Sequence, residues 1–299
     1  MKTALITSGG GAKGAFTVGA LLALKDLQLA DFDIISGTST GSLIAALAAV
    51  GKFDILQREY SNVSNEDILQ SQNFVQNLAQ GKPYFFDTIP LERKILQFID
   101  DAVYQKIIDS GKYVCFTAIS LQSGMITVFS TRMFNPPPNS IYKVVQVTSP
   151  QMLRDAVLAS SSQAAFLKPV EINGEQYVDG GNRDVLPTRP PVDLGAEVIY
   201  AMSNNPPEIA PVNGHYSSLI EVLLRSISIF IQDVRVNDYD YLDRSDAKVY
   251  KIHPNTDLDK NNPTGLFFDK NLMIAWMQNG YLLTKNIVEN DPPDAGLIT

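Results

Sequence analysis

The sequence contains very little cysteine and histidine, two residue types on which many protein functions depend. There is one cysteine and there are two histidines among 299 residues. The single Cys115 excludes an internal disulfide, and its apolar neighbours predict a buried thiol. His215 and His253 lie in no recognisable motif, so we expect neither a histidine-based metal site nor a catalytic triad.

Basic charge and long apolar runs are also scarce. Lys and Arg number 24 against 32 Asp and Glu, which gives a formal net charge of −8. Nucleic-acid binding needs a basic surface, so we expect no nucleic-acid partner, although a local apolar patch could make transient contact with a membrane surface. The longest apolar stretch, residues 43–50, is far shorter than the roughly 18 residues of a membrane span. No signal peptide is visible, so we expect a cytoplasmic protein and leave export without a cleaved signal open.

The first fifty residues predict the fold class. A strand at 3–7 opens into a glycine loop and a helix at 15–27, and a second strand at 32–36 leads through a turn into a helical run. A strand–loop–helix unit that is repeated at once predicts parallel strands in an α/β sheet. With 45% hydrophobic residues, the chain can fill a sizeable core.

Further elements are expected around that sheet. Residues 52–110 are helical and polar, and we interpret them as an insertion that could cover the site. The other expected elements are β-like runs at 113–120 and 125–131, a helix at 149–159, a hairpin around Asn173-Gly174, strands at 197–202 and 249–252, and helices at 219–236 and 269–288. We predict a single domain over residues 1–299, with the insertion at about 52–110 and a C-terminal helical extension at about 204–299.

Residues 37–41 form the pattern G-x-S-x-G between an apolar strand and a small-residue helix. Gly37 and Gly41 let the backbone turn tightly enough to expose the hydroxyl of Ser39. A serine aimed in this way can attack an acyl carbonyl when a base accepts its proton. We therefore predict that Ser39 is the nucleophile of an acyl hydrolase.

A glycine-rich loop, GGGAKG, lies upstream at residues 9–14. The N–H groups of Gly9, Gly10 and Gly11 have no side chains in the way, so we expect them to form an oxyanion hole for a tetrahedral intermediate. The loop also matches the dinucleotide pattern G-x-G-x-x-G through Gly9, Gly11 and Gly14, which keeps a phosphate-binding loop as an alternative.

Two features tell against the nucleotide alternative. A dinucleotide site needs an acidic residue at the far end of the second strand, whereas Asp31 and Asp33 precede the apolar residues of that strand. A P-loop needs Ser or Thr after its lysine, but Lys13 is followed by Gly14. We therefore favour the oxyanion hole.

A candidate base follows the predicted hairpin, where Asp179-Gly180-Gly181 begins directly after a strand. The two glycines allow this turn to pack closely against the serine turn. An aspartate at its ordinary pKa near 3.9 is a weak base, so Asp179 would need a dry site and direct contact with Ser39. The alternative is a turn residue at the end of a hairpin.

Other charged residues carry weaker signals. Four aspartates have a spacing that lacks the glycine and final glutamate of a calcium loop, so we expect a solvated helix end without metal: Asp238, Asp240, Asp243 and Asp246. Three arginines could contact a phosphate headgroup, but we expect surface ion pairs: Arg154, Arg183 and Arg189.

Together, the glycine loop, the serine turn and the Asp-Gly-Gly motif resemble the patatin-like phospholipase family over roughly residues 3–203. The resemblance implies a three-layer α/β/α sandwich with a mostly parallel central sheet. It also implies calcium-independent hydrolysis of lipid acyl esters by a Ser39–Asp179 dyad, with no cofactor. The chain has Gln163-Ala164 where many members have a proline, which leaves the substrate class open.

Two other functions remain open on the same scaffold. The first is an esterase or thioesterase for small soluble acyl groups. The second is a non-catalytic protein that binds a nucleotide or a lipid.

Overall fold

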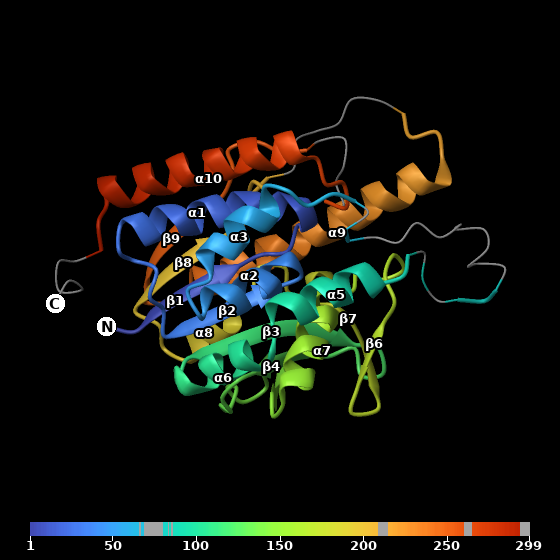
Figure 1. Ribbon diagram of the computed structural model, residues 1–299, viewed down its shortest axis with the longest axis horizontal. Coiled ribbons are helices and arrows are strands. Elements are labelled where there is room, and N and C mark those ends of the chain that lie inside the picture. The colour runs from blue at the N-terminus through green and yellow to red at the C-terminus, as the bar shows by residue number, and fades with distance from the viewer. Residues whose placement is uncertain are drawn as a thin grey trace.

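A nine-stranded mixed sheet forms the middle of the protein (Figure 1). The structure is a computed structural model that describes residues 1–65, 67–68, 80–82, 84, 86–208, 215–259 and 265–293. The strands are β1 (Thr3–Thr7), β2 (Ile34–Thr38), β3 (Tyr113–Ser120), β4 (Ile126–Ser130), β5 (Tyr142–Gln146), β6 (Val170–Ile172), β7 (Glu175–Asp179), β8 (Val198–Met202) and β9 (Lys248–Ile252). Their order is β5-β4-β3-β2-β1-β8-β9, while β7 pairs with both β3 and β6.

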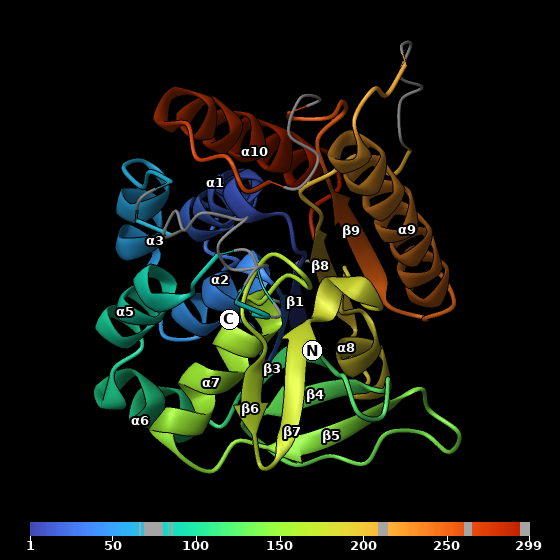
Figure 2. The same cartoon turned by 90° about the vertical axis from the view of Figure 1, so that its right-hand side faces the viewer.

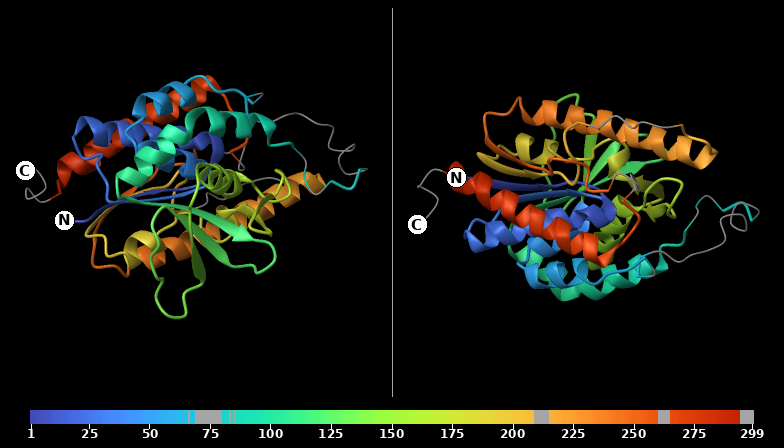
Figure 3. Two further views of the ribbon diagram at one scale, coloured as in Figure 1. Left: turned by 60° about the horizontal axis from the view of Figure 1, so that its bottom comes forward. Right: turned by 90° about the horizontal axis from the view of Figure 1, so that it is seen from above.

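The helices lie on both faces of this sheet (Figure 2). They are α1 (Gly14–Asp26), α2 (Thr40–Ala48), α3 (Phe53–Tyr60), α5 (Ile89–Phe98), α6 (Asp101–Asp109), α7 (Pro150–Ser161), α8 (Arg189–Asp193), α9 (Leu219–Leu242) and α10 (Lys270–Asn290), with short 3₁₀ turns η1 (Gly11–Lys13) and η2 (Gly180–Asn182). Helices α8 and α9 cover one face, and α1, α2 and α7 cover the other, with α10 packed on α1 (Figures 2 and 3). The predicted three-layer α/β/α sandwich is confirmed.

Burial on both faces explains the sequence of the central strands. Side chains of β1 alternate, so that Leu5 packs into the core beneath α1 and α2, while Ala4 and Ile6 pack towards α8 and α9. Strand β1 pairs in parallel with both β2 and β8, β2 pairs in parallel with β3, and β8 with β9. Parallel strands covered on both faces carry nearly continuous apolar runs, as these do.

Several sequence predictions are confirmed, with shifts at the boundaries. The hairpin turn uses Asn173 and Gly174 with φ of 52° and 80°, as a two-residue Asn-Gly turn requires. The second strand begins at Ile34 rather than at residue 32, and the helix expected at 219–236 continues to Leu242. Strand β5 and helix α8 were not predicted, because neither has a clear apolar period: β5 is mostly half-buried and α8 has only five residues.

The polar segment at 52–110 forms α3, α5 and α6, while residues 66, 69–79, 83 and 85 lie outside the described part of the chain. Helices α3 and α5 lie on the opposite side of the molecule from α9 (Figure 3). That the chain is one domain with an insertion and a C-terminal extension stays a prediction.

Candidate active site

Loops that follow three strands carry the residues of the three motifs. Strand β1 opens into the glycine loop, β2 leads directly into Ser39, and β7 ends at Asp179. Because β1 and β2 are parallel neighbours, their carboxyl ends lie at the same edge of the sheet. Ser39, Asp179 and the glycines at 9–11 all line one pocket there.

The turn that holds Ser39 has an uncommon backbone conformation. Ser39 has φ 57° and ψ −129°, which places the residue in a strained region directly before α2. The turn also needs close backbone contacts, because a Cβ on Gly37 would lie 2.4 Å from the Gly41 carbonyl oxygen, and one on Gly41 would lie 2.2 Å from that of Thr7. Only glycine fits at these two positions, so the motif fixes a sharp turn.

Serine hydroxyls behind the turn hold its backbone in place. The Ser160 hydroxyl accepts from the Ser39 N–H at 3.0 Å and donates to the Thr117 carbonyl at 2.6 Å. The Ser42 hydroxyl lies 2.7 Å from that of Ser160, and the Ser161 hydroxyl donates to the Ser39 carbonyl at 3.1 Å. No motif marks Ser160 as a support of the turn, and the only signal is a run of three serines at the end of α7.

Asp179 lies buried beside the serine. Its Oδ1 accepts from the Gly181 N–H at 2.7 Å, and the carboxylate lines the same pocket as Ser39. Burial raises the pKa of Asp179 to about 6, while the Gly181 N–H and the Ser39 hydroxyl lower the pKa because they favour the ionised form. The carboxylate therefore has a greater affinity for a proton than an exposed aspartate has.

The glycine loop differs in one detail from what we predicted. The Gly9 N–H donates to the Val185 carbonyl at 3.2 Å, so it is not free to bind an oxyanion. Among the described residues, no hydrogen-bond partner is found for the N–H groups of Gly10 and Gly11. The amide of Asn204, at the end of β8, donates to the Ser8 and Gly9 carbonyls and supports the loop.

The residues that could have served a nucleotide are engaged elsewhere. Lys13 is buried, and its Nζ lies 2.7 Å from Asp257 Oδ1 and 3.2 Å from Asn205 Oδ1. Asp33 Oδ2 accepts from the Thr3 N–H at 2.8 Å, so this acid lies at the amino end of β1 and β2, away from the glycine loop. Neither contact fits a phosphate or ribose role.

The pocket beside Ser39 is lined mainly by apolar side chains from several helices. Its apolar members include Leu43 of α2, Leu56 of α3, Ile95 and Phe98 of α5, Ile231 of α9, and Phe268. The Lys94–Glu59 ion pair, 3.0 Å long, also lies along it. Such a lining suits a hydrocarbon chain that extends from a carbonyl held at Ser39.

Neither histidine belongs to this pocket. His215 is exposed, and His253 lies beside the Pro254 carbonyl, with 3.2 Å to its Nδ1. In the part of the chain that the structure describes, no three His, Cys, Asp or Glu side chains gather as a metal site would require. None of the described helices is both long and apolar enough to cross a membrane. Cys115 is buried, as predicted.

Two expectations about charged residues are wrong. Asp238 is fully buried rather than part of a solvated helix end, because its carboxyl group contacts Leu186 and Arg189. Asp240, Asp243 and Asp246 are exposed, as expected. Arg189 is also largely buried and pairs with Asp184 and Asp238 instead of lying on the surface. Arg154 does pair with an exposed partner, Asp101 at 2.9 Å.

Comparisons with known proteins identify a family and several relatives. A family model described as patatin-like phospholipase matches residues 5–192, more than half of the chain. Uncharacterized protein R571 of Acanthamoeba polyphaga mimivirus is 26% identical over 81% of this chain and 80% of its own length. Lysophospholipase NTE1 of Debaryomyces hansenii is 24% identical over 98% of this chain, which spans only 19% of NTE1.

A solved structure is also similar. The crystal structure of VipD from Legionella pneumophila matches with a TM-score of 0.44 and 14% identity, over 97% of this chain and 67% of VipD.

Proposed function

Because the chain belongs to the patatin-like phospholipase family, we propose that its lipid acyl hydrolase activity uses Ser39 as the nucleophile and Asp179 as the only protein base. The family makes the chain a carboxylic ester hydrolase. The observation that carries the proposal is that Ser39, in its strained turn, and the buried Asp179 carboxylate line the same mainly apolar pocket.

The proposed reaction has two halves. The Ser39 hydroxyl attacks the ester carbonyl while Asp179 takes its proton, and the resulting oxyanion lies against the N–H groups of Gly10 and Gly11. When the intermediate collapses, Asp179 returns the proton to the departing alcohol and an acyl-serine remains. Water then attacks the acyl-serine, giving its proton to Asp179, and the fatty acid leaves as Ser39 is restored.

Burial explains how an aspartate can act without a histidine. An exposed carboxylate with a pKa near 4 accepts a proton weakly at neutral pH, but burial raises the pKa of Asp179 to about 6. This value lies closer to neutral pH, where a general base is most effective. Since a side chain rather than a metal-bound water serves as the base, we propose that hydrolysis needs no calcium.

The apolar pocket favours an ester with a medium or long acyl chain. Each CH₂ group that leaves water for a dry apolar wall contributes about 0.8 kcal/mol. A chain held along α2, α3 and α5 would also orient its carbonyl over Ser39, so part of this gain should appear in kcat.

Helix α9 offers a surface for contact with lipid aggregates. Ile227 and Ile231 line the pocket, whereas Ile229 and Phe230 of the same helix are exposed. No acidic residue occurs between Glu221 and Asp233, so this exposed stretch carries no charge that anionic headgroups would repel. We propose that it rests on a lipid surface while the pocket takes up one acyl chain.

A p-nitrophenyl ester series from two to sixteen carbons tests the proposed function, with Ser39→Ala as the inactive control. We expect kcat/KM to rise with chain length, and activity to persist in excess EDTA. A maximum at acetate would favour an esterase or thioesterase for small acyl groups. Loss of activity with EDTA would rule out the metal-free mechanism.

A further inference from the structure

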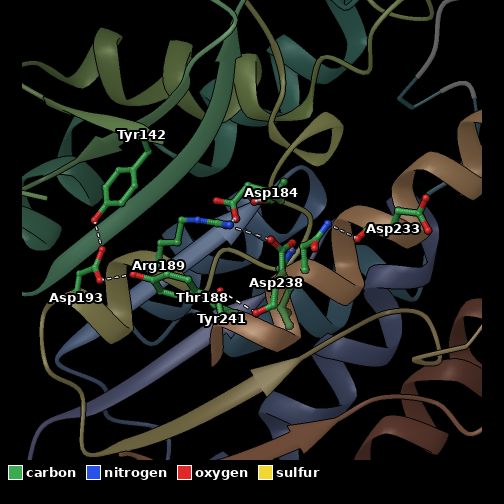
Figure 4. Close-up of polar contacts among 11 residues, drawn as sticks. Tyr142, Asp184, Thr188, Arg189, Asp193, Asp233, Asp238 and Tyr241 are labelled. Carbon is green, nitrogen blue, oxygen red and sulfur yellow. Dashed lines mark hydrogen bonds and ion pairs between the residues drawn. The ribbon is translucent and has the colours of Figure 1, made fainter. Parts of the chain in front are cut away.

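A buried arginine between α8 and α9 faces two carboxyl groups (Figure 4). Arg189 Nη1 lies 2.8 Å from Asp184 Oδ1 and 3.1 Å from Asp238 Oδ1. The side chains of Asp184 and Asp238 are 0% and 1% exposed, and that of Arg189 is 11% exposed. If both acids were ionised, one guanidinium would have to balance two carboxylates away from water, which is costly.

One carboxyl oxygen of the two acids has no hydrogen-bond donor among the described residues. Asp238 Oδ2 accepts from the Leu186 N–H at 3.0 Å, but the buried Oδ2 of Asp184 has no ordinary hydrogen-bond donor among the described residues. The two carboxyl groups lie close together, because one oxygen of each contacts the same Arg189 Nη1. Two ionised carboxylates in this position would repel each other, whereas a proton on one of them removes that repulsion and supplies a hydrogen-bond donor.

Among the described residues, Arg189 alone forms ion pairs with the two acids. Arg235, on the same helix as Asp238, is also buried and is attracted electrostatically to Asp238, but it makes no ion pair within 4 Å of either acid in the described structure. The Tyr241 ring stacks on Arg189 with 5.1 Å to its centroid, and its hydroxyl donates to Asp193 at 2.6 Å.

Three further groups face the acids. The hydroxyls of Thr117 and Tyr239 are uncharged, and the Thr188 hydroxyl donates to the Asp238 carbonyl rather than to its carboxyl group. Burial raises the pKa of Asp184 and of Asp238, and the neighbouring Asp184 charge raises that of Asp238 further. Both effects favour a bound proton.

We propose that Asp184 and Asp238 hold one proton between them, and that this acid pair, neutralised by Arg189, fastens α9 to the segment that follows Asp179. The segment at 184–189 also contacts both other parts of the site. The Asp184 carbonyl accepts from the Thr38 hydroxyl at 2.8 Å, and the Val185 carbonyl accepts from the Gly9 N–H. The shared proton therefore stabilises the contact between α9, which lines the pocket, and the segment at 184–189, which holds the serine turn and the glycine loop.

Loss of the proton has a defined consequence. Two carboxylates then repel each other across Arg189, so the contact between α9 and the segment at 184–189 weakens as the pH rises. The folded protein binds this proton more tightly than the unfolded chain does, because the folded pKa is raised. Stability should therefore fall as the pH rises from the pKa of an ordinary aspartate to the raised pKa of the pair. The equilibrium constant for unfolding should increase by up to about tenfold for each pH unit in this range.

Infrared spectroscopy detects the proton directly. We propose to record the spectrum of the Asp179→Asn protein at pH 7. This substitution removes the other buried carboxyl group of the site, and the measurement does not depend on catalysis. The C=O band of a protonated carboxyl should be present, and adding Asp238→Asn or Asp184→Asn should abolish it. Absence of the band from the Asp179→Asn protein, or its persistence in both double variants, would overturn the proposal.

The pH dependence of unfolding provides a second readout. In the Asp179→Asn background, Asp238→Asn should flatten the fall in stability with rising pH, because an amide stays neutral at every pH. Asp193→Asn is the matched control, since Asp193 lies beside the cluster and accepts hydrogen bonds from Tyr142 and Tyr241 without a second acid. If Asp238→Asn lowers the free energy of unfolding equally at all pH values and leaves its pH dependence unchanged, the residue contributes packing alone, and the shared proton is contradicted.

Discussion

The backbone N–H of Gly9 donates to the Val185 carbonyl at 3.2 Å and joins the glycine loop to the segment that follows Asp179. Of the three glycines that we predicted as oxyanion donors, Gly9 is thus engaged within the protein. The N–H groups of Gly10 and Gly11 are engaged by no described residue, so we propose these two as the donors.

The first prediction concerns these donors. A Cβ on Gly10 would lie 2.9 Å from Asn204 Cβ at a φ of 146°, so Gly10→Ala should displace the loop and its N–H. Loss of one oxyanion donor typically costs about 3 kcal/mol, so we expect kcat to fall about 100-fold or more with a smaller change in KM. Gly111→Ala is the control, because Gly111 has a similar need for positive φ but open space around it. An effect on KM alone, or tight binding of ATP or NAD, would favour the nucleotide alternative.

The second prediction concerns the support of the serine turn. Ser160→Ala should leave the Ser39 N–H and the Thr117 carbonyl without their shared partner. An unpaired buried polar group costs about 1–3 kcal/mol, so denaturant titration should show a loss of stability in that range, and kcat should fall. The neighbouring Ser162→Ala should have little effect on kcat, since the Ser162 hydroxyl only donates to Leu158 within α7. Equal losses of kcat in the two variants would contradict this role for Ser160.

The third prediction concerns the base and its pH dependence. The reactive form of Asp179 is the carboxylate, and its pKa is raised to about 6, so kcat/KM should rise as the pH increases through about 6 and then level off. Asp179→Asn should lower kcat by at least the roughly 10²–10⁴-fold that general-base loss costs. His215→Ala and His253→Ala should each stay within about tenfold of the parent chain. A histidine variant as inactive as Asp179→Asn would mean that a triad operates.

The fourth prediction concerns lipid surfaces. Phe230, 67% exposed on α9, is expected to insert into an aggregate, so Phe230→Ser should reduce hydrolysis of phospholipid vesicles but not of a soluble short-chain ester. Leu282→Ser is a matched control, because Leu282 of α10 is 66% exposed but does not line the pocket. If Phe230→Ser lowers hydrolysis of vesicles and of the soluble ester equally, Phe230 supports the structure of the pocket rather than binding to the lipid surface.

The parts of the site that were predictable from sequence are those coded over short stretches of chain. The turn around Ser39 needs Gly37 and Gly41 within five residues, and the β–α–β order places the glycine loop beside it. The hairpin before Asp179 follows from Asn-Gly in the same way. Local conformation dominates these features, so a motif can predict them.

What could not be predicted depends on contacts between distant segments. Asp184 and Asp238 are more than fifty positions apart, and nothing near Asp238 in the sequence distinguishes it from the other aspartates at the end of α9. The engagement of Gly9 by Val185 likewise depends on how β7 docks against β3. Ser160 acts on the turn only because α7 packs beside α2. These relationships arise from tertiary packing, which residue spacing does not reveal.

The central claim is that Ser39 is the nucleophile and is activated by Asp179. The most direct test is labelling with a fluorophosphonate, followed by mass spectrometry of the modified peptide, in the parent chain and in Ser39→Ala and Asp179→Asn. We predict a single adduct on Ser39, none in Ser39→Ala, and labelling slowed by orders of magnitude in Asp179→Asn. An adduct on Ser160, Ser161 or Ser162, or undiminished labelling of Asp179→Asn, would contradict the account.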